Sequence, residues 1–286
     1  MADPRPPAAP PAARTAPGFL RSSLRVFDLS LSEMLWSRRT VFMALVVGLP
    51  VVLAAVIRLL FELGAPSFRV NNAVVGGPVI FGLMIWMFFV RFSIPVLAVF
   101  YGTSLIADEV DDKTITYLFT RPIPRGSVLF GKYLAYLACT VFVVLPSVIV
   151  VWLLIVPING SLALGFIDLL KDLVVLAAGL AVYGAVFALV GAALKRPLLV
   201  GLFIIFGWET IVMALPGNLK RASVAYYLQG LVPHAMPSDS PLSLIQAVFQ
   251  EAPSLITSVL GLVVIATLCL WLAVRAVTRR EYVLEQ

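Results

Sequence analysis

Residues 133–156 read YLAYLACTVFVVLPSVIVVWLLIV, an apolar run without one charged side chain. A run of about 20 apolar residues is long enough to cross the ~30 Å hydrocarbon core of a bilayer as a helix. The run lacks the alternation of polar and apolar residues that marks a barrel strand, so a transmembrane helix is expected. This stretch sets the fold class because several further runs of the same kind surround it.

The whole chain has the composition that such runs produce. Of its 286 residues, 61% are hydrophobic and 13% are charged, and the mean hydropathy is +1.02. A soluble domain carries about 25% charged residues. The composition therefore excludes a conventional soluble enzyme, a secreted disulfide scaffold and a DNA-binding domain. Cys139 and Cys269 lie within apolar runs without metal-ligand spacing, and we interpret them as small core residues.

We expect an all-α integral membrane bundle of six transmembrane helices, preceded by an amphipathic interfacial helix. The expected spans are Val41–Phe61, Val79–Ala107, Tyr133–Val156, Leu173–Leu194, Pro197–Leu215 and Leu255–Val274. The second run would rise about 43 Å as one straight helix, more than a bilayer core requires. Residues 79–89 are therefore either a re-entrant piece or a part of the second span.

Two segments precede the spans. Residues 1–17 contain six prolines and are predicted to be a disordered cytoplasmic tail. Residues 18–37 have apolar side chains at helical spacing with polar side chains on the other faces. The apolar positions are Leu20, Leu24, Phe27, Leu31 and Leu35. This helix is too polar to span a bilayer and is expected to lie in the membrane interface; a short soluble helix packed on cytoplasmic loops is the alternative.

Charge predicts the orientation of the remaining segment, residues 38–286. Six spans place both termini on one side, and that side would hold 15 Lys and Arg residues against five on the other. Cytoplasmic loops carry the excess of positive charge, so both termini are predicted to be cytoplasmic, in the cell membrane. The same rule explains the net charge of +6 without nucleic acid as a partner. The lone His234 falls in an outer loop and has no second metal ligand near it, so no metal site is expected.

One cytoplasmic loop has a distinctive pattern. Residues 106–132 read IADEVDDKTITYLFTRPIPRGSVLFGK, with four carboxylates within residues 108–112. An apolar stretch follows and ends at Arg121 and Pro122, where a helix is expected to stop. This predicts a short acidic and then amphipathic helix across the cytoplasmic surface. An ordinary charged loop is the alternative.

This loop resembles the signature of ABC-2-type transporter permeases, the membrane subunits of one class of ATP-binding-cassette exporters. The matching residues are Glu109, Asp111, Thr114, Leu118, Pro122, Arg125, Gly131 and Lys132. Lys113 departs from the pattern, which usually has glycine there. The resemblance implies that residues 108–127 form a coupling helix that docks on a separate ABC ATPase subunit, with Asp112 and Arg121 contributing charged contacts. It also implies that residues 19–36 are the connecting helix beside it.

The resemblance further implies a permease that exports cargo across the cytoplasmic membrane. ATP and magnesium would bind to the partner ATPase, and two permease chains would pair as a homodimer or a heterodimer in the bilayer. No catalytic, cofactor-binding or metal-binding residue is assigned to this chain. A secondary transporter, or a membrane-embedded assembly factor or enzyme without an ATPase partner, is the alternative function.

Residues 126–133 also fit the start of a phosphate-binding P-loop, G-x-x-x-x-G-K. A P-loop requires Ser or Thr at the next position and a buried strand before it. Here Tyr133 follows, and proline-rich chain precedes. ATP binding is therefore not expected at this place.

Arg91 and Glu209 are the charges predicted to lie deepest in the membrane. Each costs about 2.5–3.5 kcal/mol on insertion scales unless it is partnered. We expect the two to form an intramembrane charge pair that fixes helix packing; Arg58 is the other candidate partner for Glu209, and a substrate-contact or proton-relay role is the alternative.

Overall fold

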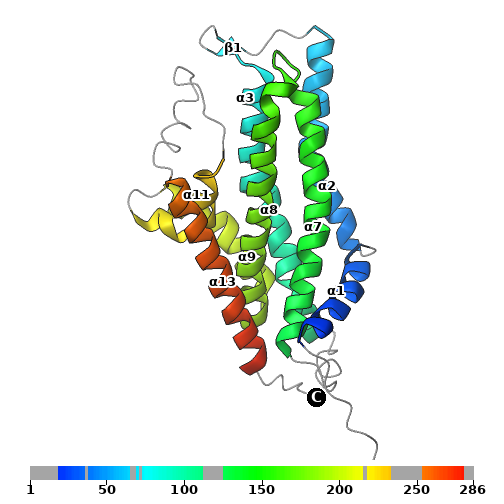
Figure 1. Ribbon diagram of the computed structural model, residues 1–286, viewed down its shortest axis with the longest axis vertical. Coiled ribbons are helices and arrows are strands. Elements are labelled where there is room, and N and C mark those ends of the chain that lie inside the picture. Colours follow the sequence, from blue (N-terminus) through cyan, green and yellow to red (C-terminus); the bar gives the residue numbers. More distant parts are fainter. Residues whose placement is uncertain are drawn as a thin grey trace, which may run out of the picture.

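The computed structural model describes residues 19–35, 38–64, 69–70, 73–111, 125–214, 218–232 and 253–279. Long helices stand side by side as an upright bundle, and α1 lies across the end at which the C-terminus is found (Figure 1). The predicted tail, residues 1–17, lies outside the described residues, as do residues 112–124 of the acidic loop and His234.

The order of elements follows the apolar runs. The first part of the chain forms α1 (Phe19–Leu35), α2 (Arg38–Glu62), a hairpin of β1 (Arg69–Val70) and β2 (Ala73–Val74), α3 (Gly77–Met84), η1 (Ile85–Ser93), α4 (Ile94–Leu97), η2 (Ala98–Gly102) and α5 (Ser104–Asp111). The second part forms α7 (Arg125–Ile155), α8 (Leu162–Ala193), α9 (Pro197–Phe203), η3 (Ile204–Glu209), α10 (Thr210–Ala214), η4 (Asn218–Ala222), α11 (Val224–Gln229) and α13 (Leu255–Arg279).

Five helical segments of the described chain are long and apolar enough to cross a membrane. They are Thr40–Glu62, Gly77–Asp108, Gly126–Ile155, Gly165–Ala193 and Leu255–Arg279. The fifth predicted span appears as a shorter apolar helix, Pro197–Val212. The helical membrane class is confirmed, whereas the count of six spans stays a prediction.

The second predicted span is a single long helix. Residues 79–89 run from α3 into η1 without a break, so they belong to the same helix as the residues that follow. The segments η1 and η2 are π-helical, with wider turns than an α-helix. Further along the chain, η3 is π-helical as well. Turns of this kind often occur at functional sites.

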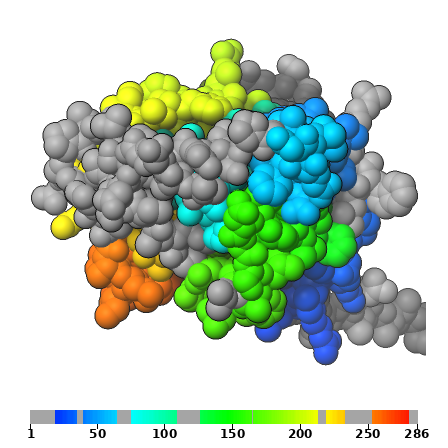
Figure 2. Space-filling model, turned by 90° about the horizontal axis from the view of Figure 1, so that it is seen from above, coloured from blue at the N-terminus to red at the C-terminus, as the bar shows by residue number. Residues whose placement is uncertain are grey.

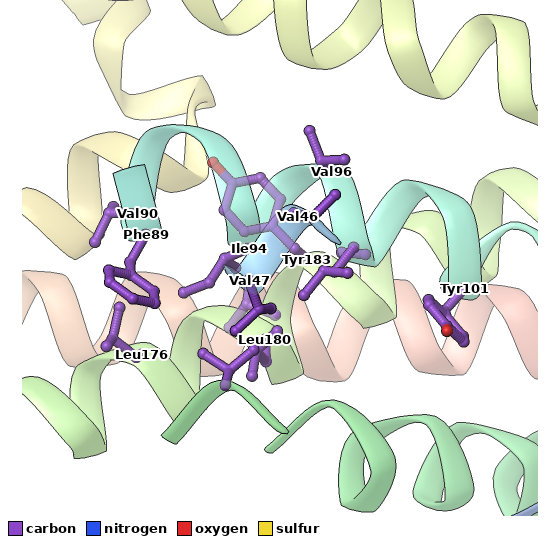
Figure 3. Packing of buried hydrophobic residues seen from close by; sticks show 14 of the residues in the cluster. Val46, Val47, Phe89, Val90, Ile94, Val96, Tyr101, Leu176, Leu180 and Tyr183 are labelled. Carbon is purple, nitrogen blue, oxygen red and sulfur yellow. The ribbon is translucent and has the colours of Figure 1, made fainter. Parts of the chain in front are cut away.

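The second long helix and α8 are the most buried of the five long apolar helices, at 67% and 61% of their apolar windows, and the packing of α8 depends on small residues. Buried residues make up only 11% of the apolar window of α13, which lies at the edge. Figure 3 shows Leu176, Leu180 and Tyr183 of α8 facing Phe89 and Ile94 of the η1–α4 segment. Close helix approach at small residues is the usual basis of packing in membranes, where lipid is as apolar as the side chains.

The contacts at the glycines of α8 show close packing against other helices of the chain. A Cβ atom at Gly184 would lie 2.2 Å from the Tyr136 ring of α7. One at Gly191 would lie 2.3 Å from the backbone oxygen of Thr103. The glycines therefore let α8 approach both α7 and the second long helix.

The end of the bundle opposite the C-terminus carries the turn between α7 and α8 and the end of α2 (Figures 1 and 2). Gly77 at the start of α3 is held there, because its N–H donates to the carbonyl oxygen of Ile158 at 2.6 Å. This contact fixes the start of the second long helix against the α7–α8 turn.

Candidate coupling and intramembrane sites

The acidic loop is bordered by α5 and α7. Both helices reach it at the end of the bundle where the C-terminus lies (Figure 1). Glu109 and Asp111 occupy the last turn of α5, and Arg125 begins α7. Their side chains are outside the described part of the structure, as are Asp112, Thr114, Leu118, Arg121 and Pro122. The roles assigned to these residues therefore stay predictions. The helices on either side of the loop, α5 and α7, belong to the described structure.

The first turns of α7 are fastened to α1. A Cβ atom at Gly131 would lie 2.5 Å from the backbone oxygen of Ser23 and 2.9 Å from the Cβ of Val26. Only a residue without a side chain permits this approach. The neighbouring Lys132 is half-buried. Gly131, which matches the permease signature, is thus a packing residue between α7 and α1.

The predicted apolar face of α1 is divided, because Leu31 packs against the hydrophobic core whereas the leucines of the first two turns are exposed. Ser22, Ser23 and Ser30 are buried, whereas Leu20 and Leu24 are 72% and 58% exposed. The serine side fits against α7 because short side chains allow the helix axes to approach closely. Leu20 and Leu24 are therefore not covered by the described part of the chain.

The other border of the loop, α5, is fastened to α8. A Cβ atom at Gly102 would lie 2.9 Å from the Cβ of Phe187, and the contact of Gly191 with Thr103 lies one turn further along α8. Leu105 of α5 is 1% exposed. The helices that border the acidic loop are therefore each held close to a neighbour, α7 to α1 at Gly131 and the residues just before α5 to α8 at Gly102 and Gly191.

The stretch that imitates a P-loop is helical. Residues 126–133 all belong to α7. A Cβ atom at Gly126 would lie 3.0 Å from the side chain of Val274 of α13. A phosphate cradle is formed by a loop whose backbone N–H groups point at the ligand, a geometry that a helix interior does not have.

Glu209 is the centre of a buried polar junction. It is 6% exposed and lies at the end of η3. Its Oε2 accepts a hydrogen bond from the hydroxyl of Tyr183 of α8. Its Oε1 accepts from the Oγ of Ser223 at 3.5 Å and from the backbone N–H of Val224, the first residue of α11, at 3.3 Å. One carboxylate thus joins η3, α8 and α11.

Arg91 lies in η1, near this junction. It is close enough to Glu209 for the two charges to act on each other electrostatically. Its Nη1 atom is buried, and no hydrogen-bond acceptor lies within reach of it among the described residues. The ion pairs within 4.0 Å that the described residues form include Arg58–Glu62 and Lys171–Asp168 but not Arg91–Glu209. The predicted pairing of Arg91 with Glu209 stays a prediction, and the observed donors to Glu209 are neutral groups.

Residues 26–278 match the family described as ABC-2 family transporter protein. The chain belongs to the ABC-2 family of transporter proteins. None of the curated proteins matches the chain significantly.

Membership of the ABC-2 family confirms the resemblance found in the acidic loop. The match begins within α1 and ends in the last turn of α13, so it covers all the candidate membrane spans. An ABC-2 chain with these spans is a multi-pass membrane protein and a transporter component. The family assignment is consistent with a chain that has no catalysis of its own.

The junction around Glu209 includes residues that the sequence did not indicate. Tyr183 and Ser223 are 1% exposed, but neither stands out in an apolar or small-residue context. Asp172 was missed as well, since the fourth span was predicted to begin at Leu173. In the structure α8 begins at Leu162, which places Asp172 inside the helix, where it is fully buried.

Proposed function

We propose that this chain is the permease subunit of an ABC exporter. It moves cargo across the cytoplasmic membrane, driven by ATP hydrolysis on a separate ATPase subunit. The chain works as a pair with a second permease, identical or related, and the two permeases bind two ATPases. The observation that carries the proposal is the position of the acidic loop in this ABC-2 chain, between two helices whose contacts admit no side chain.

The tight contacts support a role for residues 108–127 as a mechanical lever. An ATPase outside the membrane can act on the spans only through a segment that does not yield when it is pushed. Contacts at Gly131 and Gly191 leave no gap between α7 and α1 or between α8 and Thr103, the residue that precedes α5. Packed interfaces of this kind shift as units and do not deform gradually.

The same contacts supply a physical route from the lever into the membrane. Phe187 of α8 touches Gly102, and its ring stacks with that of Tyr183 at a centroid distance of 6.2 Å. Tyr183 in turn donates to Glu209. A shift of α5 against the cytoplasmic end of α8 would therefore reach the polar junction through neighbouring contacts.

The exposed edge of α1 supports the interfacial position expected for this helix. Leu20 and Leu24 project away from α7, and the exposed Arg21 and Arg25 lie on the adjacent face. An apolar edge next to basic side chains suits the boundary between acyl chains and phosphate headgroups. In this position α1 holds the start of α7 at the membrane surface beside the lever.

The decisive experiment is co-purification of the full-length permease with its candidate ABC ATPase, comparing wild type with Glu109→Arg. Glu62→Arg is the matched control, since Glu62 is exposed at the other end of the bundle. Capture by wild type and the control but not by Glu109→Arg, with membrane insertion intact, supports docking at the lever. Equal capture by all three places docking elsewhere. Capture by none refutes the exporter and favours a secondary transporter or an assembly factor.

A further inference from the structure

Glu209 holds the segment 218–229, which comprises η4 and α11, against the bundle. The two donors at Ser223 and Val224 come from the start of α11, while Tyr183 belongs to α8. Ser223, Val224 and Glu209 are all buried. Leu228, one turn further along α11, packs against Gly179 of α8. A Cβ atom at Gly179 would lie 3.2 Å from the Leu228 side chain. The carboxylate is therefore a polar part of the attachment of this segment.

Arg91 is half-buried, and one of its nitrogen atoms, Nη1, is a buried donor without an acceptor among the described residues. A guanidinium stays charged in proteins, and a buried N–H group without a hydrogen-bonded partner costs free energy. Within the described structure, the Nη1 of Arg91 is buried and makes no hydrogen bond, although Glu209 lies within electrostatic range. The nearby carboxylate is already occupied by three donors from other elements.

We propose that Glu209 exchanges partners during the transport cycle. In the observed arrangement its carboxylate binds the start of α11. In the second arrangement it leaves Ser223 and Val224, pairs directly with Arg91, and releases the segment 218–229 from the bundle. The inference rests on the proposed transport function, in which the permease alternates between two states.

The Glu209 carboxylate has hydrogen-bond donors in both proposed arrangements. When α11 detaches, its N–H groups and the Ser223 hydroxyl reach water, and the carboxylate gains a charged donor in place of two neutral ones. A charge-assisted hydrogen bond is roughly twice as strong as a neutral one. Neither arrangement leaves the carboxylate without donors, so the two can lie close in free energy.

The backbone at both residues suits such a movement. Arg91 lies within η1 and Glu209 ends η3, and both segments are π-helical. Conversion of a π-turn to an α-turn rotates the side chains that follow it, because the two helices differ in residues per turn. A rotation at either segment would change the distance from the Arg91 guanidinium to the Glu209 carboxylate.

The test is hydrogen–deuterium exchange of the backbone amides in residues 218–229, measured on the purified full-length permease in nanodiscs without an ATPase. Arg91→Gln removes the cation that stabilises the released state. We expect exchange in this segment to slow by about tenfold, the effect of losing one hydrogen bond between charged groups. Arg91→Lys keeps the positive charge and should retain most of the wild-type exchange rate. Arg58→Gln, which removes an exposed arginine paired with Glu62, is the control and should leave the segment unchanged.

The sign of the effect separates this proposal from a purely structural role. If Arg91 supports the observed arrangement, Arg91→Gln will loosen the segment and exchange will become faster. Faster or unchanged exchange overturns the proposal, and so does an equal slowing by Arg58→Gln. The result is independent of ATPase capture. Slower exchange together with failed capture would keep the partner exchange and refute the exporter.

Discussion

Substitution of Gly131 by alanine should displace α1 from the bundle. The new Cβ would lie 2.5 Å from the Ser23 backbone oxygen, about 0.9 Å short of the 3.4 Å at which ordinary contact begins. The obstructing atom belongs to the backbone of α1, so a side-chain rotation cannot relieve the clash and the helix itself must move. Overpacking of this kind costs about 1–3 kcal/mol.

Helix propensity acts in the opposite direction at this position. Alanine is favoured over glycine in a helix interior by about 1 kcal/mol. With a clash against backbone at the upper end of the overpacking range, the net loss is about 1–2 kcal/mol. Each kcal/mol lowers the melting temperature by about 2–4 °C in a domain of about 150–250 residues. We therefore expect the midpoint to fall by roughly 2–8 °C.

Gly48→Ala is the matched control for Gly131→Ala. Gly48 also lies inside a helix, α2, but a Cβ there would meet nothing within 4 Å. Its substitution should leave the melting temperature unchanged or raise it. The assay is the thermal loss of monodisperse protein in one detergent at one heating rate, for wild type and both variants. A Gly131→Ala protein as stable as Gly48→Ala would refute the account of the α1–α7 contact.

Three further predictions concern the packing and the charges inside the bundle. Gly191→Ala should lower the melting temperature more than Gly165→Ala, because the first Cβ would lie 2.3 Å from a backbone oxygen and the second no closer than 3.5 Å to any atom; equal midpoints would contradict this. Tyr136→Phe should cost about 0.5–1.5 kcal/mol, since it removes a buried hydroxyl that donates to a backbone carbonyl at 2.9 Å, and a thermal scan with unchanged midpoint would disagree. Glu209→Lys should reduce expression through like charges near Arg91, and addition of Arg91→Glu should restore it; failure of the double variant in a membrane-fraction immunoblot would argue against the pairing.

Much of the fold could be predicted because hydropathy is a local property. The apolar runs placed α2, α7 and α13 to within a few residues at most ends, and helical spacing placed α1. The start of α8 was predicted eleven residues too late, since Asp168, Lys171 and Asp172 interrupt the apolar run there. Charges near a helix end do not stop the helix when one of them is buried and the others form an ion pair.

The signature of the acidic loop likewise lies in consecutive residues, so the sequence alone indicated the family that the match over residues 26–278 then showed. The free energy of transferring a segment from water to lipid depends on the composition of that segment. A docking motif likewise depends on a short run of consecutive side chains. Such properties are determined before any helix finds its neighbour.

Contacts between helices were decided only by the tertiary structure. The sequence offered Arg91 as the partner of Glu209 on depth and charge, whereas the folded chain brings Tyr183, Ser223 and the N–H of Val224 to the carboxylate. Which side chains meet depends on the rotation of each helix about its axis. The wide turns of η1 and η3 change that rotation, and the hydropathy pattern does not indicate where such turns occur. A rotation shared by several packed helices is a property of the whole bundle, which no single segment specifies.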